Sequence, residues 1–359
     1  MMIPTRPLLT AALLGVVAAL LLCGDDRQPA ARGGGAKTAK HSSGRVLPPM
    51  PAVREPVLFN TPEADAILAA MQVFPPDNPW NEDVSRRPLL KNSKAMVATV
   101  GNGGKLAVNL DMGFIIVPPG QKRVDVKIAR NQGEAYGGES DPGPFPVPDN
   151  LPVEDWVPGG RRKLEDLQRG GRGDRHAIVV DPVNGKLYEF YHILKTDAGW
   201  TASQTSAFDL NSNRLRPDGW TSTDAAGLPI FPATVRFDEV ERGMVEHAMR
   251  FTVRNSRNAY VYPATHKASN KANPDFPRMG ERFRLRQDFD LTGFSPHAQA
   301  ILKGLKKYGM IVADNGGNWR ISVAPDRRIQ GLADLGRVKG SDFEVVEPTG
   351  PNEGPRGKK

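Results

Sequence analysis

Two of the six histidines in the chain lie in one short stretch, residues 246–269 (EHAMRFTVRNSRNAYVYPATHKAS). If the polar segment 255–258 forms a four-residue hairpin loop, the residues on either side pair as two apolar strands. His247 then lies directly opposite His266, with Cβ atoms about 5 Å apart. Two imidazoles at that distance cannot both be charged at low cost, so at least one stays neutral near pH 7. A neutral imidazole can act as a general base or bind a metal ion.

Pro263 does not suit a central strand, so this hairpin is expected at a sheet edge or rim that a substrate can reach. Two alternatives stay open. A register shift of one residue would turn one histidine to the opposite face. Even when paired, the two rings could serve only to hydrogen-bond backbone groups.

A metal site would need further ligands, and His176, in the segment GDRHAIVVD, is the next candidate beside His247 and His266. Zinc sites usually have three protein ligands. Candidate carboxylate ligands are Asp174, Asp181 and Asp314. Because no HExxH or similarly close spacing occurs, a metal-dependent hydrolase is the third hypothesis. No cofactor other than such a divalent metal ion is predicted.

Carboxylates offer a second route, because paired acids are the usual equipment for glycoside hydrolysis. Glu189 lies between two aromatic residues in KLYEFYH (186–192), and a carboxylate in apolar surroundings has a raised pKa and can act as a general acid. Asp224 lies in GWTSTDAAGLPI near Trp220, where a flat ring beside polar groups suits a sugar. The structural alternative is that an Asp in such a loop caps a turn. Glu189 and Asp224 are the predicted acid pair of a hydrolase.

Arginines suggest a third chemistry. In ERFRLRQ (281–287) they alternate with apolar residues, so one strand face could hold a polyanion such as a uronate polymer. In a polysaccharide lyase, Arg250 or Arg284 would neutralise the substrate carboxylate. His247 or His266 would then be the catalytic base. The alternative is that this arginine stripe is only the solvated face of a strand.

Asp314 follows the apolar run GMIV and precedes the turn sequence NGG, so it would lie at the lip of a tight turn. Its simplest role is structural, but it could also line a cleft. With Arg284, Trp220 and Tyr262 it completes the residues predicted to contact a substrate. Tryptophans and loop acids would also form the sugar platform of a non-catalytic binding or structural module, which is the competing function.

These residues must be positioned by short elements, since 37 glycines and 32 prolines interrupt the chain. Strands are predicted at 112–118, 123–129, 175–181, 186–192, 247–254, 258–263, 281–287, 309–314 and 318–323. Asn184-Gly185 predicts a hairpin between two of them. Helices are predicted from Thr61 and Ser295, each an N-cap followed by proline, with a short third helical turn at 238–246. The predicted fold is mainly β, an antiparallel β-sandwich or jelly-roll-like body with two or three short helices.

Six long segments within about residues 75–347 are distinctive: ESDPGPFPVP, FDLNSN, GWTSTDAAGLPIFPATVRFDEV, HAMRFTV, FSPHAQAILKGLKKYGMIVADNGGNW and GSDFEVVE. In these segments the chain resembles a family of secreted, lipoprotein-like bacterial β-rich proteins without an assigned activity. This resemblance implies a single extracytoplasmic domain and supplies no catalytic residues.

The N-terminal residues predict export. An apolar run at 8–22 is short for a membrane span and typical of a secretory signal. Cys23, the only cysteine, follows at once, so residues 1–23 resemble a lipoprotein signal with lipidation at Cys23. Leu22 stands where such signals prefer a small residue, so an uncleaved anchor or ordinary cleavage nearby is the alternative. Either way, the protein is expected outside the cytoplasm, secreted or lipid-anchored to the cell envelope.

Composition divides the rest of the chain. Residues 24–56 are predicted to be a disordered tether, 57–347 a single β-rich domain and 348–359 a disordered tail. The net charge of +8 arises partly at these ends, and no nucleic-acid-binding motif occurs, so no nucleic-acid partner is expected. The membrane would be touched only through the N-terminal anchor. The leading prediction is an exported polysaccharide hydrolase or lyase acting on a polysaccharide or cell-envelope polymer.

Overall fold

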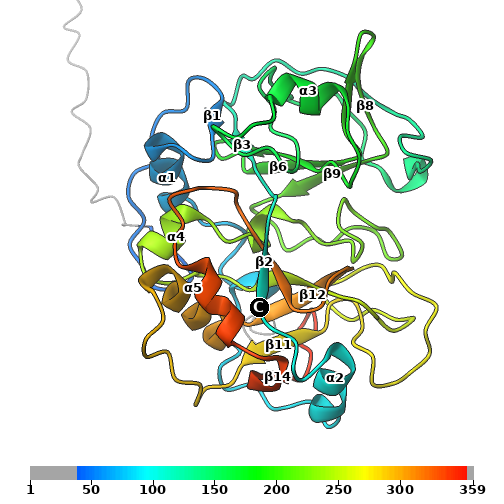
Figure 1. Ribbon diagram of the computed structural model, residues 1–359. Helices are drawn as coiled ribbons and strands as arrows, with labels where there is room; N and C mark the ends of the chain where they lie inside the picture. The colour runs from blue at the N-terminus through cyan, green and yellow to red at the C-terminus, as the bar shows by residue number, and fades with distance from the viewer. Residues whose placement is uncertain (1–38, 354–359) are drawn as a thin grey trace, which may run out of the picture. The chain divides into compact units, whose positions relative to one another are not determined.

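The computed structural model describes residues 39–353 (Figure 1). Contacts group these residues into one unit. The predicted signal at 1–23, with Cys23, and the first part of the predicted tether lie outside the described residues. No helix in the described part is long and apolar enough to cross a membrane.

A five-stranded sheet forms one half of this unit, in the order β1, β3, β5, β6, β9. The strands are β1 (Val57–Leu58), β3 (Ile115–Ile116), β5 (Ala177–Asp181), β6 (Lys186–Tyr191) and β9 (Gln204–Asp209). The hairpin predicted from Asn184-Gly185 is confirmed, because β5 and β6 pair antiparallel around it. Asp181 Oδ1 accepts a hydrogen bond from Asn184 N at 2.9 Å and closes the turn.

A six-stranded sheet forms the other half, in the order β14, β11, β12, β10, β13, β2. The strands are β2 (Ala107–Leu110), β10 (Met249–Val253), β11 (Arg282–Leu285), β12 (Met310–Asn315), β13 (Arg320–Val323) and β14 (Phe343–Val345). Phe251, Phe283 and Trp319 pack on one another with ring centroids 5.1–6.0 Å apart. These rings lie in the larger of two hydrophobic clusters, which also contains the apolar face of α5 (Pro296–Lys307).

A three-stranded sheet of β4 (Val126–Ile128), β8 (Gly199–Ala202) and β7 (Leu194–Thr196) accompanies the five-stranded sheet. Trp200 and Phe190 belong to the same smaller cluster, so these two sheets share a core.

The two helices predicted from N-cap signals start where expected. Thr61 Oγ1 accepts from Ala64 N at 3.2 Å at the start of α1 (Pro62–Ala69). Ser295 occupies the N-cap position of α5 without a side-chain capping bond. The other helices are α2 (Ser93–Val100), α3 (Leu164–Arg169), α4 (Phe237–Glu241) and the 3₁₀ helices η1 (Pro79–Asn81), η2 (Gly137–Glu139), η3 (Phe231–Ala233), η4 (Leu332–Arg337) and η5 (Gly340–Asp342). α4 overlaps the predicted turn at 238–246 and packs beside α5 (Figure 1).

The predicted fold is supported only in its coarse features. Strand exceeds helix only slightly, 22% against 18%, and none of the sheets is closed. Each sheet contains a parallel pair, whereas the predicted sandwich is antiparallel. The reason is burial on both faces: β5 and β10 are buried along their whole length, as expected for strands covered on two sides.

The predicted hairpin between 247–254 and 258–263 is wrong. β10 pairs parallel with β12 on one edge and antiparallel with β13 on the other, so neither edge is left for residues 258–263. Tyr260 instead forms an isolated bridge with Met279. A parallel pair needs a long crossover, which here contains β11 and α5. Local turn signals in the sequence do not reveal such a pairing.

The predicted tether is shorter than expected, because residues 39–56 include a segment docked on the body. Ser43 Oγ donates to Glu246 Oε1 at 2.7 Å. Arg45 Nε donates to Glu246 Oε2 at 3.1 Å. Composition favours disorder here and carries no information on these contacts with a distant residue. At the other end, Thr349 of the predicted tail is buried.

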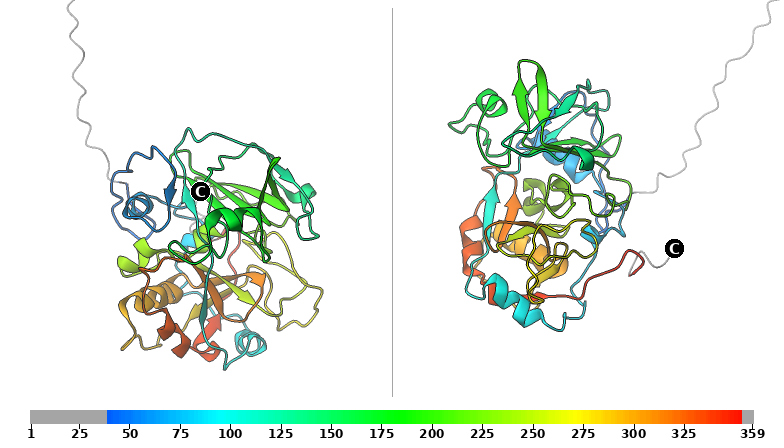
Figure 2. Two further views of the ribbon diagram at one scale, coloured as in Figure 1. Left: turned by 45° about the horizontal axis from the view of Figure 1, so that its top comes forward. Right: turned by 90° about the vertical axis from the view of Figure 1, so that its right-hand side faces the viewer.

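Residues 221–235, called the bridging segment below, join the two larger sheets, and in the right-hand view of Figure 2 this part of the chain lies between them. Glu189 Oε1 on β6 accepts from Ile230 N and Phe231 N, both at 2.9 Å. On the other side, Arg250 Nε on β10 donates to Asp224 Oδ2 at 2.6 Å. The bridging segment is therefore held by a buried ionisable side chain from each sheet.

Candidate functional site

One cleft, with a volume of about 370 Å³, collects side chains from both larger sheets. Its lining residues are Glu134, Tyr136, Asp174, His176, Tyr191, Thr221, Ser222, Thr223, Ala225, His266, Ala268, Asp314 and Asn315. His176 precedes β5, Tyr191 ends β6 and Asp314 lies near the end of β12, so the cleft spans the junction of the two sheets. Among the described residues that line it there are three acids but no lysine or arginine.

A groove of about 530 Å³ along β9 is larger, but it is a weaker candidate for an active site. Its charged side chains neutralise one another: Lys186 pairs with Asp209 at 3.0 Å, and Arg216 with Asp141 at 2.5 Å. The 370 Å³ cleft is the stronger candidate, because pockets with convergent polar groups and shifted pKa values are typical of active sites.

Backbone hydrogen bonds hold His266 near Asp314. Ala226 N in the bridging segment donates to Ala313 O at 2.9 Å, and Ala226 O accepts from His266 N at 3.3 Å. A single stretch of backbone thus lies between the two residues. The cleft receives both side chains from segments about 50 positions apart in the sequence.

Asp314 is a carboxyl group with an unusual environment. Its side chain is 28% exposed, and its Oδ2 lies 4.0 Å from Arg250 Nη2. Arg250 already donates to both oxygens of Asp224, at 2.6 and 2.7 Å, so the Asp224 carboxylate balances much of its positive charge. Burial, assisted by the negative charge of Asp224, raises the pKa of Asp314 to about 7 against the opposing effect of Arg250. A protonated carboxyl group is therefore well populated at neutral pH.

His266 presents a defined nitrogen. Its Nδ1 lies 2.8 Å from Ala225 O. A carbonyl oxygen can only accept, so we assign the proton of the neutral ring to Nδ1. The lone pair then resides on Nε2, the nitrogen that can accept a proton from a ligand or water in the cleft.

An acidic and aromatic group forms another part of the cleft wall. Tyr191 Oη donates to Glu134 Oε2 at 3.0 Å, and Tyr136 Oη donates to the same oxygen at 3.4 Å. The Tyr136 and Tyr191 rings lie 6.3 Å apart. Such rings combine an apolar face with a hydrogen-bonding group, which suits the two-sided surface of a sugar.

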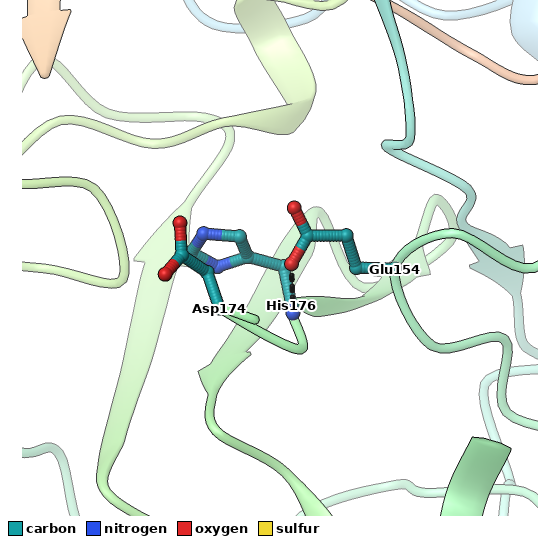
Figure 3. Close-up of side chains that lie close together, drawn as sticks. All are labelled: Glu154, Asp174 and His176. Atoms are coloured by element: carbon teal, nitrogen blue, oxygen red, sulfur yellow. Dashed lines mark hydrogen bonds between the residues drawn. The ribbon is translucent and has the colours of Figure 1, made fainter. Parts of the chain in front are cut away.

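Glu154, Asp174 and His176 form a cluster beside this wall (Figure 3). One potential ligand atom from each residue lies within 4.8 Å of the others. His176 N donates to Glu154 Oε2 at 3.2 Å. His176 Nδ1 is buried and has no hydrogen-bond partner. Burial raises the pKa of Glu154 to about 7.

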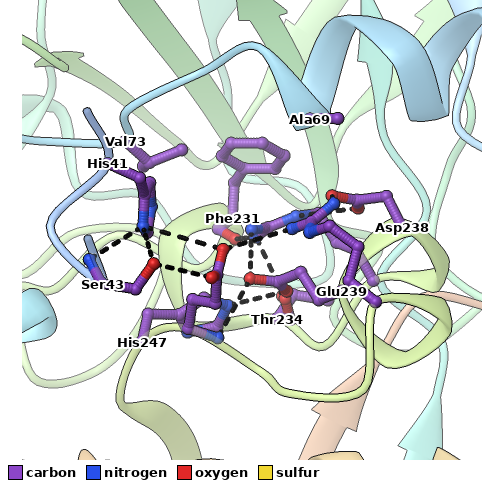
Figure 4. A network of polar contacts seen from close by, with 12 residues as sticks. His41, Ser43, Ala69, Val73, Phe231, Thr234, Asp238, Glu239 and His247 are labelled. Atoms are coloured by element: carbon purple, nitrogen blue, oxygen red, sulfur yellow. Dashed lines mark hydrogen bonds and ion pairs between the residues drawn. The ribbon is translucent and has the colours of Figure 1, made fainter. Parts of the chain in front are cut away.

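His247, predicted as a catalytic base or metal ligand, occupies a different place. It is buried, its Nδ1 donates to Ala248 O at 2.8 Å and its Nε2 lies 3.0 Å from Glu239 Oε2. Figure 4 shows it in a polar network with His41 and Ser43 of the docked N-terminal segment. The cavity there, of about 10 Å³, has room for at most about one water molecule. The predicted His247–His266 pair is therefore not present.

The predicted acid pair serves the fold instead. Glu189 is completely buried, and Thr223 Oγ1 donates to its Oε2 at 3.0 Å in addition to the two backbone donors. Asp224 is 1% exposed and binds Arg250, which is 3% exposed and was predicted to neutralise a substrate. None of these three residues lines the cleft. The apolar setting of Glu189 was predicted correctly and raises its pKa to about 7, but it also excludes a substrate.

The predicted substrate-binding residues are scattered. Arg284 is buried, paired with Glu344 at 2.7 Å. Its Nη1 also donates to two backbone carbonyl groups of residues 84–87, so it is not part of a solvated stripe. Trp220 is partly exposed beneath the guanidinium of Arg216, and Tyr262 lines a separate shallow pocket. Of the residues predicted for a site, the cleft contains Asp314, His266, His176 and the candidate ligand Asp174.

Tyr191 and Glu134 are among the cleft residues missing from the predicted set, although a sequence signal does indicate the position of Tyr191. The Asn184-Gly185 turn sets the β5–β6 register with Ala177 opposite Phe190. Extending that ladder by one position places Tyr191 beside His176, and their rings are indeed 5.5 Å apart. Glu134 lies in an irregular loop with no signal of comparable strength.

Comparison of the chain with models of protein families, with curated proteins and with solved structures found no match. The resemblance to a family of secreted bacterial proteins therefore stays a prediction. The chemistry of the cleft has to be argued from its own residues.

Proposed function

We propose that this protein is a glycoside hydrolase that cleaves a neutral polysaccharide in the 370 Å³ cleft, with Asp314 as general acid and His266 as general base. The observation that carries the proposal is the partly exposed Asp314 carboxyl group in a cleft that also contains a basic imidazole nitrogen. Location outside the cytoplasm is proposed on the N-terminal sequence alone.

Asp314 would protonate the glycosidic oxygen as the bond from that oxygen to the anomeric carbon breaks. A carboxyl group with a pKa of about 7 is half protonated at neutral pH and remains a strong enough acid to transfer its proton. Its neighbour Arg250 lies 4.0 Å away and is shared with Asp224, so its positive charge only partly opposes the effect of burial on Asp314.

His266 would activate the water that completes the reaction. Water attacks the anomeric carbon and loses a proton to His266 Nε2, while the leaving sugar keeps the proton from Asp314. The reaction yields two shorter sugar chains, and water is the only reactant besides the polysaccharide. A single displacement of this kind inverts the anomeric configuration.

The charges of the cleft favour a neutral substrate over a uronate. Glu134, Asp174 and Asp314 line it, and the described lining contains no lysine or arginine. Both arginines that a lyase would need, Arg250 and Arg284, are buried in internal ion pairs. A polyanion would be repelled, whereas the hydroxyl groups of a neutral sugar can donate to the carboxylates and the apolar face of its ring can stack on the tyrosine rings.

The first prediction concerns Asp314→Asn. Because the amide cannot donate a proton to the leaving oxygen, kcat on a responsive polysaccharide should fall by about 10²–10⁴-fold. Full-length protein would be screened against a polysaccharide panel for new reducing ends. Asp288→Asn, an exposed acid on the loop after β11, is the matched control and should retain wild-type activity.

The same assay tests the titration of Asp314. The carboxyl group must be protonated to act as an acid, so kcat/KM should fall as pH rises above about 7. Glycan binding without new reducing ends would identify a non-catalytic binding module. New absorbance near 235 nm would identify a lyase. Either result, or an active Asp314→Asn variant, contradicts the proposal.

A further inference from the structure

We propose that Glu154, Asp174 and His176 bind a divalent transition-metal ion of the zinc or manganese class at the wall of the cleft. Asp174 and His176 line the cleft, while Glu154 approaches them from the loop before α3. The site uses residues other than Asp314 and His266, so it is separate from the proposed acid and base.

The three side chains are close to a coordinating arrangement. Their ligand atoms lie within 4.8 Å of one another, and the imidazole lies between the two carboxylates in Figure 3. Ligands about 2.1 Å from a tetrahedral ion are about 3.4 Å apart. Closing around an ion therefore needs only small side-chain rotations, which exposed Asp174 can make most easily.

Unsatisfied polar atoms give an independent reason to expect a ligand. His176 is 4% exposed, and its Nδ1 has no hydrogen-bond partner. Asp111 Oδ1, which is also buried and unpartnered, belongs to a carboxylate that interacts electrostatically with both His176 and Glu154. Buried polar atoms are nearly always satisfied, so the unpartnered His176 Nδ1 inside the cluster, with Asp111 in electrostatic contact with it, suggests a missing partner.

The charges around the cluster are unbalanced. Within residues 39–353, no lysine or arginine forms an ion pair with Asp111, Glu154 or Asp174. Two arginines influence Glu154 electrostatically: Arg250, which is already bound to Asp224, and Arg175, whose guanidinium donates to backbone carbonyl groups. A divalent cation would remove this repulsion between carboxylates more effectively than any side chain present.

The donor set limits the kind of ion. One imidazole nitrogen with two carboxylate oxygens suits zinc or manganese, whereas calcium takes oxygen ligands only and usually six to eight of them. Three protein ligands leave open positions on the cleft side for water or another oxygen ligand. On the proposed function, those positions would take glycan hydroxyl groups.

Metal binding to the full-length, chelator-treated protein tests the proposal without any glycan. Isothermal titration with Zn²⁺ and with Mn²⁺ should show one ion per chain, with Ca²⁺ much weaker. Asp174→Asn should weaken binding by at least about tenfold. His176→Gln should do the same, and circular dichroism of each metal-free variant shows whether it has folded.

Asp155→Asn is the matched control, because it removes the same charge from the neighbour of Glu154. Asp155 is exposed and has a φ of 66°, a conformation that asparagine also tolerates. Its affinity should stay within about threefold of wild type. No binding of Zn²⁺ or Mn²⁺, or equal losses in Asp155→Asn and Asp174→Asn, would overturn the site. Because no turnover is measured, either result leaves the hydrolase proposal standing.

Discussion

At the scale of the residue, Glu189 and Asp314 show why a shifted pKa alone does not identify a catalytic acid. Burial raises the pKa of both to about 7. Glu189 is completely buried, and its oxygens accept hydrogen bonds from Thr223 and two backbone N–H groups. The Asp314 side chain, in contrast, lines the cleft. Access to a substrate separates the structural acid from the candidate catalytic acid.

We expect Glu189→Gln to affect stability and not chemistry. The amide group would point a donor at groups that already donate to this side chain, and such a mismatch lowers the free energy of unfolding by about 1–3 kcal/mol. Urea unfolding would measure the loss. Activity per folded molecule should stay near wild type, the opposite pattern to Asp314→Asn. A folded but inactive Glu189→Gln protein would argue against this assignment.

At the scale of the element, the bridging segment decides which residues meet. One stretch of its backbone lies between His266 and Asp314, and it binds a buried ionisable side chain on each larger sheet. Gly227 allows the close approach of this segment to residues 264–266. Its φ is 74°, and a Cβ atom there would lie 2.0 Å from Thr265 Oγ1 and 2.6 Å from Trp220 O.

Gly227→Ala should therefore lower the free energy of unfolding by about 2–4 kcal/mol, because strain at a positive φ adds to a steric clash. Any activity should fall with it, since His266 would shift relative to Asp314. Gly103→Ala is the control: nothing lies within 4 Å of the added Cβ, and no positive φ occurs there. Thermal unfolding of the two variants side by side measures the difference, and equal stability would refute the role given to Gly227.

At the scale of the whole molecule, the segment around His41 links the start of the described chain to its body. Ser43 N donates to His41 Nδ1 at 3.1 Å, so this nitrogen must be unprotonated in the folded state. Burial lowers the pKa of His41 from 6.5 to about 4; nearby Glu246 opposes the shift, while Arg45 and Arg242 reinforce it. The docked segment therefore favours the neutral form of His41.

The contribution of His41 to stability should depend on pH. Between pH 6.5 and about 4 the unfolded chain binds a proton that the folded protein does not. This contribution is complete above pH 6.5 and is lost as the pH falls toward 4, by at most about 3 kcal/mol. His41→Asn should flatten that part of the stability curve, measured by urea unfolding across the pH range. Parallel curves for both proteins would contradict this linkage.

Much of the local structure is predictable from the sequence. The Asn184-Gly185 hairpin, the helix after Thr61 and the helix after Ser295 all appear where their turn and capping signals place them. These predictions succeed because turn geometry, helix capping and apolar spacing depend only on residues a few positions apart. Export signals at residues 1–23 are equally local, but they lie outside the described residues and stay predictions.

The site itself depends on contacts that no short segment encodes. β10 pairs parallel with β12 across a crossover of more than 50 residues, which separates His247 from His266 and places Asp314 at the junction of two sheets. Whether a carboxyl group is buried or reachable depends on which distant strands cover it. The sequence alone shows which residue types are present. Which of them meet in one cleft is decided by long-range packing, because burial and charge balance are properties of the assembled core.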